Sequence, residues 1–223
     1  MSTTAMWLLL AVVVIVIVFA SVLYKRTFTV HELALTGVMA ALSLVAYLFF
    51  RVPFYGGSSF HLGNTFTALT ALLLDGVSGG LAGAIGLALA DILAGDPGYA
   101  ITTFVLKFII GITCGAVAHK AFKLRELDKH SSGYLVKVIV AAASGLLLGT
   151  LAMGLIMMPA NHIITPYFTG WPVEAVDALL LPGILPFNLI KAGLNSGVTF
   201  LLYKTVSRYI VHGEGWQKPA AQK

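Results

Sequence analysis

The chain has 223 residues, of which 58% are hydrophobic and 10% are charged, and its mean hydropathy is +0.92. So few charges cannot cover the surface of a water-soluble domain of this length, so the composition excludes that class and indicates a polytopic membrane protein. The formal net charge of +5 follows from the placement of basic residues on one side of a membrane and does not point to a nucleic acid.

The apolar segments predict seven membrane-spanning helices in one compact domain. A bilayer core about 30 Å thick requires roughly 20 apolar residues per helix. Backbone polar groups must be satisfied inside lipid, which favours helices. The expected spans, of which the third is short, are 6–24, 32–50, 63–75, 77–95, 100–121, 133–158 and 179–208.

The first segment, 6–24, is expected to be a retained helix with its N-terminus outside. It has no basic residue before its apolar run, and Lys25 and Arg26 follow it, which differs from a signal peptide. Alternating from there, the basic residues near positions 25, 120–137 and 204–223 fall in the cytoplasm. Only Arg51 remains as a basic residue outside, which agrees with the positive-inside rule.

Small residues recur at helical spacing in three of the expected spans. They are Gly79, Gly83, Gly86, Ala90, Gly111, Gly115, Gly145 and Gly149. Helices in lipid associate through close backbone approach, so we interpret these faces as internal packing. The face formed by Ala34, Gly37 and Ala41 has two interpretations, which are internal packing and a surface offered to another membrane protein.

Ionisable side chains at membrane depth indicate a polar cavity. Lys107 lies about 10 Å below the outer surface at 1.5 Å per residue, and Lys191 lies at a similar depth in the last span. Asn188, Lys191, Asn195 and Thr199 share one face of that span. Lipid does not solvate such a face, so it is expected to turn toward the interior.

Two interpretations of these charges stay open. Asp91 can reach Lys107 by depth, so the two residues could form a purely structural ion pair. Alternatively, the lysines and asparagines line an outward-opening cavity in which they bind the oxygens or ring nitrogens of a small polar molecule. The aromatic and glycine-rich loop 51–64 would then cover the ligand. His61 in this loop either contacts the ligand or is a solvated loop histidine.

Catalytic motifs are absent from the sequence. It contains no HExxH, no GxSxG and no Walker A motif, and its six histidines lack metal-ligand spacing. We therefore expect no enzymatic activity, no cofactor and no metal. Active transport by this chain would need a partner that hydrolyses ATP.

The stretch "FHLGNTFTALTALLLDGVSGGLAGAIGLALADILAG", followed by "ITTFVLKFIIGITCGAVAHK", resembles the core of the substrate-binding S components of energy-coupling factor (ECF) vitamin transporters. The group includes riboflavin S components and relatives proposed for pyridoxine or hydroxymethylpyrimidine. The last span, "LPFNLIKAGLNSGVTFLLYK", also resembles the final helix of the family. The resemblance covers roughly 32–210 and rests on the joint order of these pieces.

This resemblance implies an all-α membrane protein with a six-helix S-component core, to which segment 6–24 adds a seventh span. The expected divisions are an N-terminal helix and linker (1–30), the substrate-binding domain (31–210) and a cytoplasmic tail (211–223). It also implies a location in the cell membrane of a prokaryote. One vitamin of the riboflavin, pyridoxine or hydroxymethylpyrimidine class would be captured from outside and passed inward through a transmembrane coupling subunit and two ATPase subunits.

The residues carried over from the resemblance fall into two groups. The candidate substrate-binding residues are Tyr55, His61, Asn64, Asp91, Lys107, Asn188, Lys191 and Asn195. Ala34, Gly37 and Ala41 match the docking motif for the coupling subunit. The alternative hypothesis is a membrane scaffold that transports nothing and whose intramembrane lysines are structural.

Overall fold

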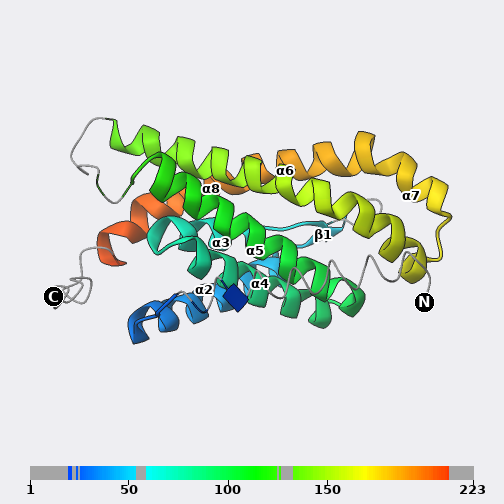
Figure 1. Cartoon of the computed structure of the whole chain (residues 1–223), viewed down its shortest axis with the longest axis horizontal. Helices are drawn as coiled ribbons and strands as arrows, with labels where there is room; N and C mark the ends of the chain where they lie inside the picture. The colour runs from blue at the N-terminus through cyan, green and yellow to red at the C-terminus, as the bar shows by residue number, and fades with distance from the viewer. Residues whose placement is uncertain are drawn as a thin grey trace.

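The computed structural model describes residues 20–21, 24, 26–53, 59–124, 126 and 133–210, which form an elongated helical bundle (Figure 1). The described helices and strands are α2 (Val30–Phe49), β1 (Val52–Pro53), β2 (Ser59–Phe60), α3 (Gly63–Leu73), α4 (Gly76–Leu93), α5 (Ala100–Ala116), α6 (Tyr134–Thr169), α7 (Val173–Leu179) and α8 (Leu185–Ile210). A 3-10 turn, Pro97–Tyr99, precedes α5, and π-helical turns follow α5 at Val117–Ala121 and precede α8 at Leu180–Ile184.

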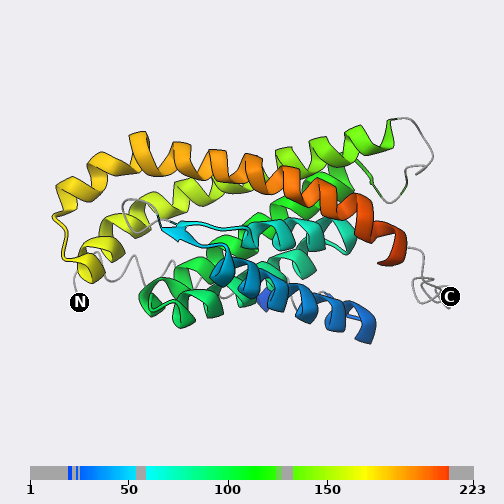
Figure 2. The same ribbon diagram turned by 180° about the vertical axis from the view of Figure 1, so that it is seen from behind.

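The helices form two sides with a middle layer between them. α6 and α8 run along one long side, α2 and α4 lie on the other, and α3 and α5 lie between them (Figures 1 and 2). The antiparallel hairpin β1–β2 leads directly into α3, with Val52 opposite Phe60. The hairpin therefore lies where α3 begins, close to α8 (Figure 2).

Five described segments are long and apolar enough to cross a membrane, namely Val30–Phe49, Gly76–Leu93, Pro97–Ala121, Tyr134–Leu151 and Val173–Ser207. They match five of the predicted spans and confirm a membrane protein with a mostly helical fold. α3 has 11 residues, about 16 Å of helix, and nearly all its side chains are buried by other helices. The predicted count of seven spans is therefore not confirmed, and segment 6–24 lies almost entirely outside the described residues.

One predicted boundary is wrong. The sixth span was expected to end at 158, but α6 continues to Thr169 and α7 begins at Val173. The helix ends at Gly170, which has a φ of 70° and donates its N–H to the carbonyl of Pro166. Glycine adopts this left-handed conformation at a helix end without strain, and Pro172 follows it.

α4 packs closely against three different helices, because each of its glycines faces another neighbour. A Cβ on Gly79 would lie 2.7 Å from the backbone nitrogen of Ala71 in α3. A Cβ on Gly80 would lie 2.9 Å from the carbonyl oxygen of Phe108 in α5, and one on Gly86 would overlap a carbonyl of α2. These contacts confirm that the small residues of α4 serve internal packing.

The glycines of α5 and α6 complete this packing. Cβ atoms on Gly111 and Gly115 would overlap the backbone of α4 at Gly80 and Gly76, respectively. A Cβ on Gly145 of α6 would lie 2.9 Å from the Cα of Cys114 in α5. These glycines thus allow α5 to pack against α4, and α6 to pack against α5, at backbone distance.

Asp75 forms the tight turn between α3 and α4 and caps α4. Its Oδ1 accepts N–H groups from Val77 at 2.9 Å and Ser78 at 3.0 Å. These bonds satisfy amides that have no partner within the helix. Its Oδ2 accepts a hydrogen bond from Arg26 at 2.6 Å, so the cap also joins the start of α4 to the segment before α2.

Gly111→Ala should destabilise the fold strongly, because the new methyl group would overlap the backbone of α4, which cannot move aside as a side chain can. Overpacking of this kind costs about 1–3 kcal/mol. We expect a markedly lower melting temperature in detergent than for Gly193→Ala on α8, where a Cβ would have no neighbour within 4 Å. Equal melting temperatures for the two variants would contradict this account of the α4–α5 contact.

Candidate ligand-binding site

The polar face of α8 turns toward the interior of the bundle. Lys191, Asn195 and Thr199 are buried, and Asn195 is completely inaccessible. Thr65 of α3 donates its hydroxyl to Oδ1 of Asn195 at 2.9 Å, and Thr199 donates to the carbonyl of Thr65 at 3.2 Å. Asn188 lies on the same helix but is only half-buried, and its Nδ2 donates to the carbonyl of Ile184 at 2.9 Å.

Lys191 joins α8 to the hairpin. Its Nζ donates to the carbonyl oxygen of Ser59 in β2 at 2.8 Å and lies 2.9 Å from Nε2 of His61. The same atom lies 5.9 Å from the centre of the Phe187 ring. The amino group therefore points into the space where the end of the hairpin meets the start of α3.

His61 is buried at this junction and is not the solvated loop histidine that the sequence left open. Its ring lies against that of Tyr47, with the centroids 4.5 Å apart, and Asn195 donates its amide to the His61 carbonyl at 3.3 Å. Burial, together with the positive charges of Lys191, Lys107 and Arg51, holds the pKa of His61 well below its usual range. The imidazole is therefore neutral at physiological pH.

Asp91 and Lys107 lie in the same interior, each less than a tenth exposed. The Asp91 carboxylate accepts hydrogen bonds from the hydroxyls of Tyr47 in α2 and Thr103 in α5 and interacts with the Lys107 charge. Lys107 in turn interacts with the charge of Lys191. Asp91 therefore lies in the same polar cluster as Lys107 and Lys191, which is compatible with both interpretations of Asp91.

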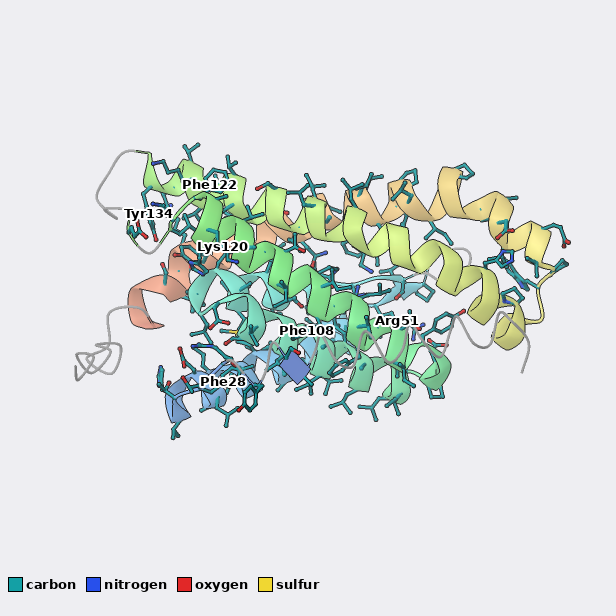
Figure 3. The ribbon with its side chains drawn as sticks, in the orientation of Figure 1. Phe28, Arg51, Phe108, Lys120, Phe122 and Tyr134 are labelled. Atoms are coloured by element: carbon teal, nitrogen blue, oxygen red, sulfur yellow. The ribbon has the colours of Figure 1, made fainter. Side chains whose placement is uncertain are left out.

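The cluster lies in the half of the bundle that contains the hairpin, which we call the outer half because the charge distribution in the sequence assigns it to the outside. At its edge, Arg51 donates to Asp96 at 2.7 Å and its guanidinium lies 5.4 Å from the centre of the Tyr47 ring. Figure 3 shows Arg51 in this half, whereas Lys120 and Tyr134 lie toward the opposite end. The ion pair links the end of α2 to the turn between α4 and α5.

Asn64, in the first turn of α3 close to His61 and Thr65, has unused hydrogen-bonding capacity. Its side chain is 4% exposed, and among the described residues its Oδ1 has no hydrogen-bond donor. A buried amide oxygen without a partner is costly, and a ligand N–H or O–H could satisfy it. Tyr55, the remaining predicted site residue, lies outside the described residues.

Three contributors were not predicted from the sequence as site residues, namely Tyr47, Thr65 and Thr103. Each is a hydroxyl residue in an apolar helix and bonds a residue of another helix. A buried hydroxyl needs a partner, so their positions in apolar segments were the available signal. The sequence does not reveal which partner each one finds.

The cluster brings together several kinds of polar group that can form hydrogen bonds. It offers amino groups at Lys107 and Lys191, amides at Asn64 and Asn188, and a carboxylate at Asp91. Within the described part of the chain, no three His, Cys, Asp or Glu side chains are placed to hold a metal ion. Convergent donors and acceptors among apolar and aromatic side chains are typical of small-molecule sites.

Comparisons with known proteins agree with this description. Residues 27–208 match the family model described as "ECF-type riboflavin transporter, S component". A solved structure, described as "Structure and mechanism of the S component of a bacterial ECF transporter", is similar in fold, with a TM-score of 0.54 at 20% sequence identity over 80% of this chain and 96% of that one. The search of curated proteins finds no match.

Asn195→Ala should destabilise the outer half, because it removes the acceptor of Thr65 and the donor to the His61 carbonyl. Leaving such buried groups unpaired costs about 1–3 kcal/mol each. Asn188→Ala is the matched control, since its amide bonds only its own helix. We expect a clear drop in melting temperature for Asn195→Ala and little change for Asn188→Ala. A larger drop for Asn188→Ala would refute the structural role assigned to the Asn195 amide.

Proposed function

Because the chain belongs to the family of ECF-type riboflavin transporter S components, we propose that it captures a water-soluble vitamin from outside the cell and delivers it inward. Members of this family are substrate-binding subunits of membrane transporters and not enzymes. The proposed ligand is of the riboflavin, pyridoxine or hydroxymethylpyrimidine class. The observation that carries the proposal is the buried polar cluster of the outer half, where Asn64 retains an unused acceptor.

The chemistry of the cluster suits a flat heteroaromatic ring. Lys191 and Asn188, one turn apart on α8, can donate to ring carbonyls or nitrogens. The Asn64 oxygen can accept an N–H or O–H from the opposite side, and Phe187 and Tyr47 offer aromatic faces. Rings with alternating donors and acceptors, as in the three vitamin classes, would use both kinds of group at once.

The hairpin is the proposed cover of this site. Its second strand is attached to α8 through the bond from Lys191 to Ser59. A ligand carbonyl could accept a hydrogen bond from the same amino group. If it displaced the Ser59 carbonyl, the hairpin would be held less tightly to α8. Binding and the position of the cover are thereby connected through one side chain.

Delivery inward requires partners, which we propose to be a transmembrane coupling subunit and two ATPase subunits, because the chain has no ATP-binding motif. The candidate docking surface is the face of α2 formed by Ala34, Gly37 and Ala41. All three residues are exposed, and a Cβ on Gly37 would have no neighbour within 4 Å. Another helix could therefore approach this face to backbone distance.

Lys191→Ala should weaken vitamin binding by about 10-fold or more, because hydrogen bonds to charged groups contribute about 1.5–3 kcal/mol. The ligand is first identified by mass spectrometry of the small molecules that co-purify with the protein in detergent. Calorimetric titration with riboflavin, pyridoxine and hydroxymethylpyrimidine then measures affinity. Lys204→Ala, at an exposed position on the same helix, is the control and should bind normally.

Two outcomes would overturn the proposal. If none of the three vitamins bound at micromolar concentration and no vitamin co-purified, the assigned ligand class would be wrong. If Lys191→Ala bound as tightly as the wild type but melted earlier, the lysine would be structural, as a scaffold protein requires.

Gly37→Leu should abolish co-purification with the coupling subunit and leave vitamin affinity unchanged, since the leucine would prevent close helix approach far from the polar cluster. Gly193→Leu, at an exposed glycine on α8, is the matched control and should assemble normally. The measurement is a pull-down of the coexpressed coupling module followed by vitamin titration. Retained assembly in Gly37→Leu would remove this face of α2 from consideration.

A further inference from the structure

The position of the N-terminal apolar segment, residues 6–24, can be inferred from the residue that follows it. The family match begins at 27, so this segment is an addition to the matched core. As a helix it would measure about 28 Å, close to the thickness of a bilayer core. Two faces of the bundle could receive it, namely the small-residue face of α2 and the outer surface of α4 and α5.

Arg26 shows where the segment ends. Its guanidinium donates to Asp75 at 2.6 Å and to Glu32 at 2.8 Å, and it lies 5.2 Å from the centre of the Phe28 ring. These bonds attach Arg26 to the N-cap of α4 as well as to the first turn of α2. The side chain is only 26% exposed, so the end of the segment is fixed against the bundle.

A cavity next to Arg26 identifies the neighbouring helices. The cavity of about 330 Å³ is lined by Arg26, the start of α4 at Asp75–Val77, the end of α5 at Ile112, Gly115 and Ala116, and the turn with His119 and Lys120. No residue of α2 lines it. The segment that leads into Arg26 therefore ends beside the α4–α5 contact.

From this cavity, two apolar rows run toward the outer half, one on each helix. The row on α4 comprises Val77, Leu81, Ile85, Ala88 and Ile92, and the row on α5 comprises Ile101, Val105, Ile109, Ile112 and Ala116. Every member is exposed or partly exposed, and each row advances by three or four residues, which keeps it on one helix face. No charged side chain interrupts either row.

We propose that segment 6–24 packs as a helix along these two rows, from Arg26 to the outer surface, and leaves the small-residue face of α2 free for a partner. The rows extend about 22 Å along their helices, so the segment of about 28 Å is long enough to cover them, and both the rows and the segment are uncharged. The close approach of α4 and α5 at Gly80 and Gly111 keeps the two rows side by side. The segment would stabilise the core without competing for the docking surface.

The exposed residues at the end of the segment define its core-facing side. Ala20, Ser21 and Tyr24 are helical and exposed, and at 100° per residue they share one face. If the segment continues as one helix, Ile15 falls on the opposite face and Ile17 on the exposed one. Counting back from Arg26 at 1.5 Å per residue places Ile15 at the depth of Ile85 on α4 and Val105 on α5.

Disulfide cross-linking in native membranes tests this placement in a Cys114→Ala background. Ile15→Cys should form a disulfide with Ile85→Cys or Val105→Cys, detected by peptide mass spectrometry with and without reductant. Two controls should give at least five-fold less product. The first pairs Ile17→Cys with the same partners, and the second pairs Ile15→Cys with Val38→Cys, which is exposed on α2.

Each other result overturns the proposal. Preferred cross-linking to Val38 would place the segment over α2, and failure with both Ile85 and Val105 in protein of normal melting temperature would place lipid or another subunit on the rows. Arg26→Gln should lower the yield several-fold, whereas Arg51→Gln, which breaks the ion pair at the other end, should not. An unchanged yield in Arg26→Gln would show that Arg26 does not position the segment.

Discussion

The structure depends on the contact between the backbones of α4 and α5, which only glycine permits. Gly80 and Gly111 face each other so closely that a methyl group on Gly111 would overlap the main chain. Lipid is as apolar as the side chains, so moving an apolar side chain from lipid into a helix contact gains little free energy. Close approach and dispersion contacts therefore supply the association energy. This contact holds α4 against α5, and other glycines of α4 bring α2 and α3 against the same helix.

The polar cluster follows from that arrangement. With α4 and α5 at backbone distance, Asp91 and Lys107 come within electrostatic reach, and hydroxyls from α2 and α5 complete the hydrogen bonds of the carboxylate. α3 is short and enclosed by other helices, so the hairpin before it lies within the outer half. There, Ser59 and His61 contact Lys191. An isolated charge is unfavourable in a membrane interior. These charges are tolerated because each one interacts with polar or charged partners in the cluster.

The sequence allowed the packing faces and the direction of the α8 polar face to be predicted, because both depend on local periodicity. The partners of Asp91 could not be predicted, because Tyr47 lies on a helix far away in the chain and only tertiary packing brings it near. The length of α6 was not predicted, because the sixth span was expected to end at 158, whereas the helix ends only at Gly170.

The central claim is that the buried cluster between α3, α8 and the hairpin is the place where a vitamin binds. A structure determined with the co-purifying vitamin bound tests it most directly. The account predicts a ligand in the outer half, within hydrogen-bonding distance of the Asn64 oxygen and the Lys191 amino group. A ligand located elsewhere, with Asn64 still lacking a partner and Lys191 bonded as before to Ser59 and His61, would contradict it.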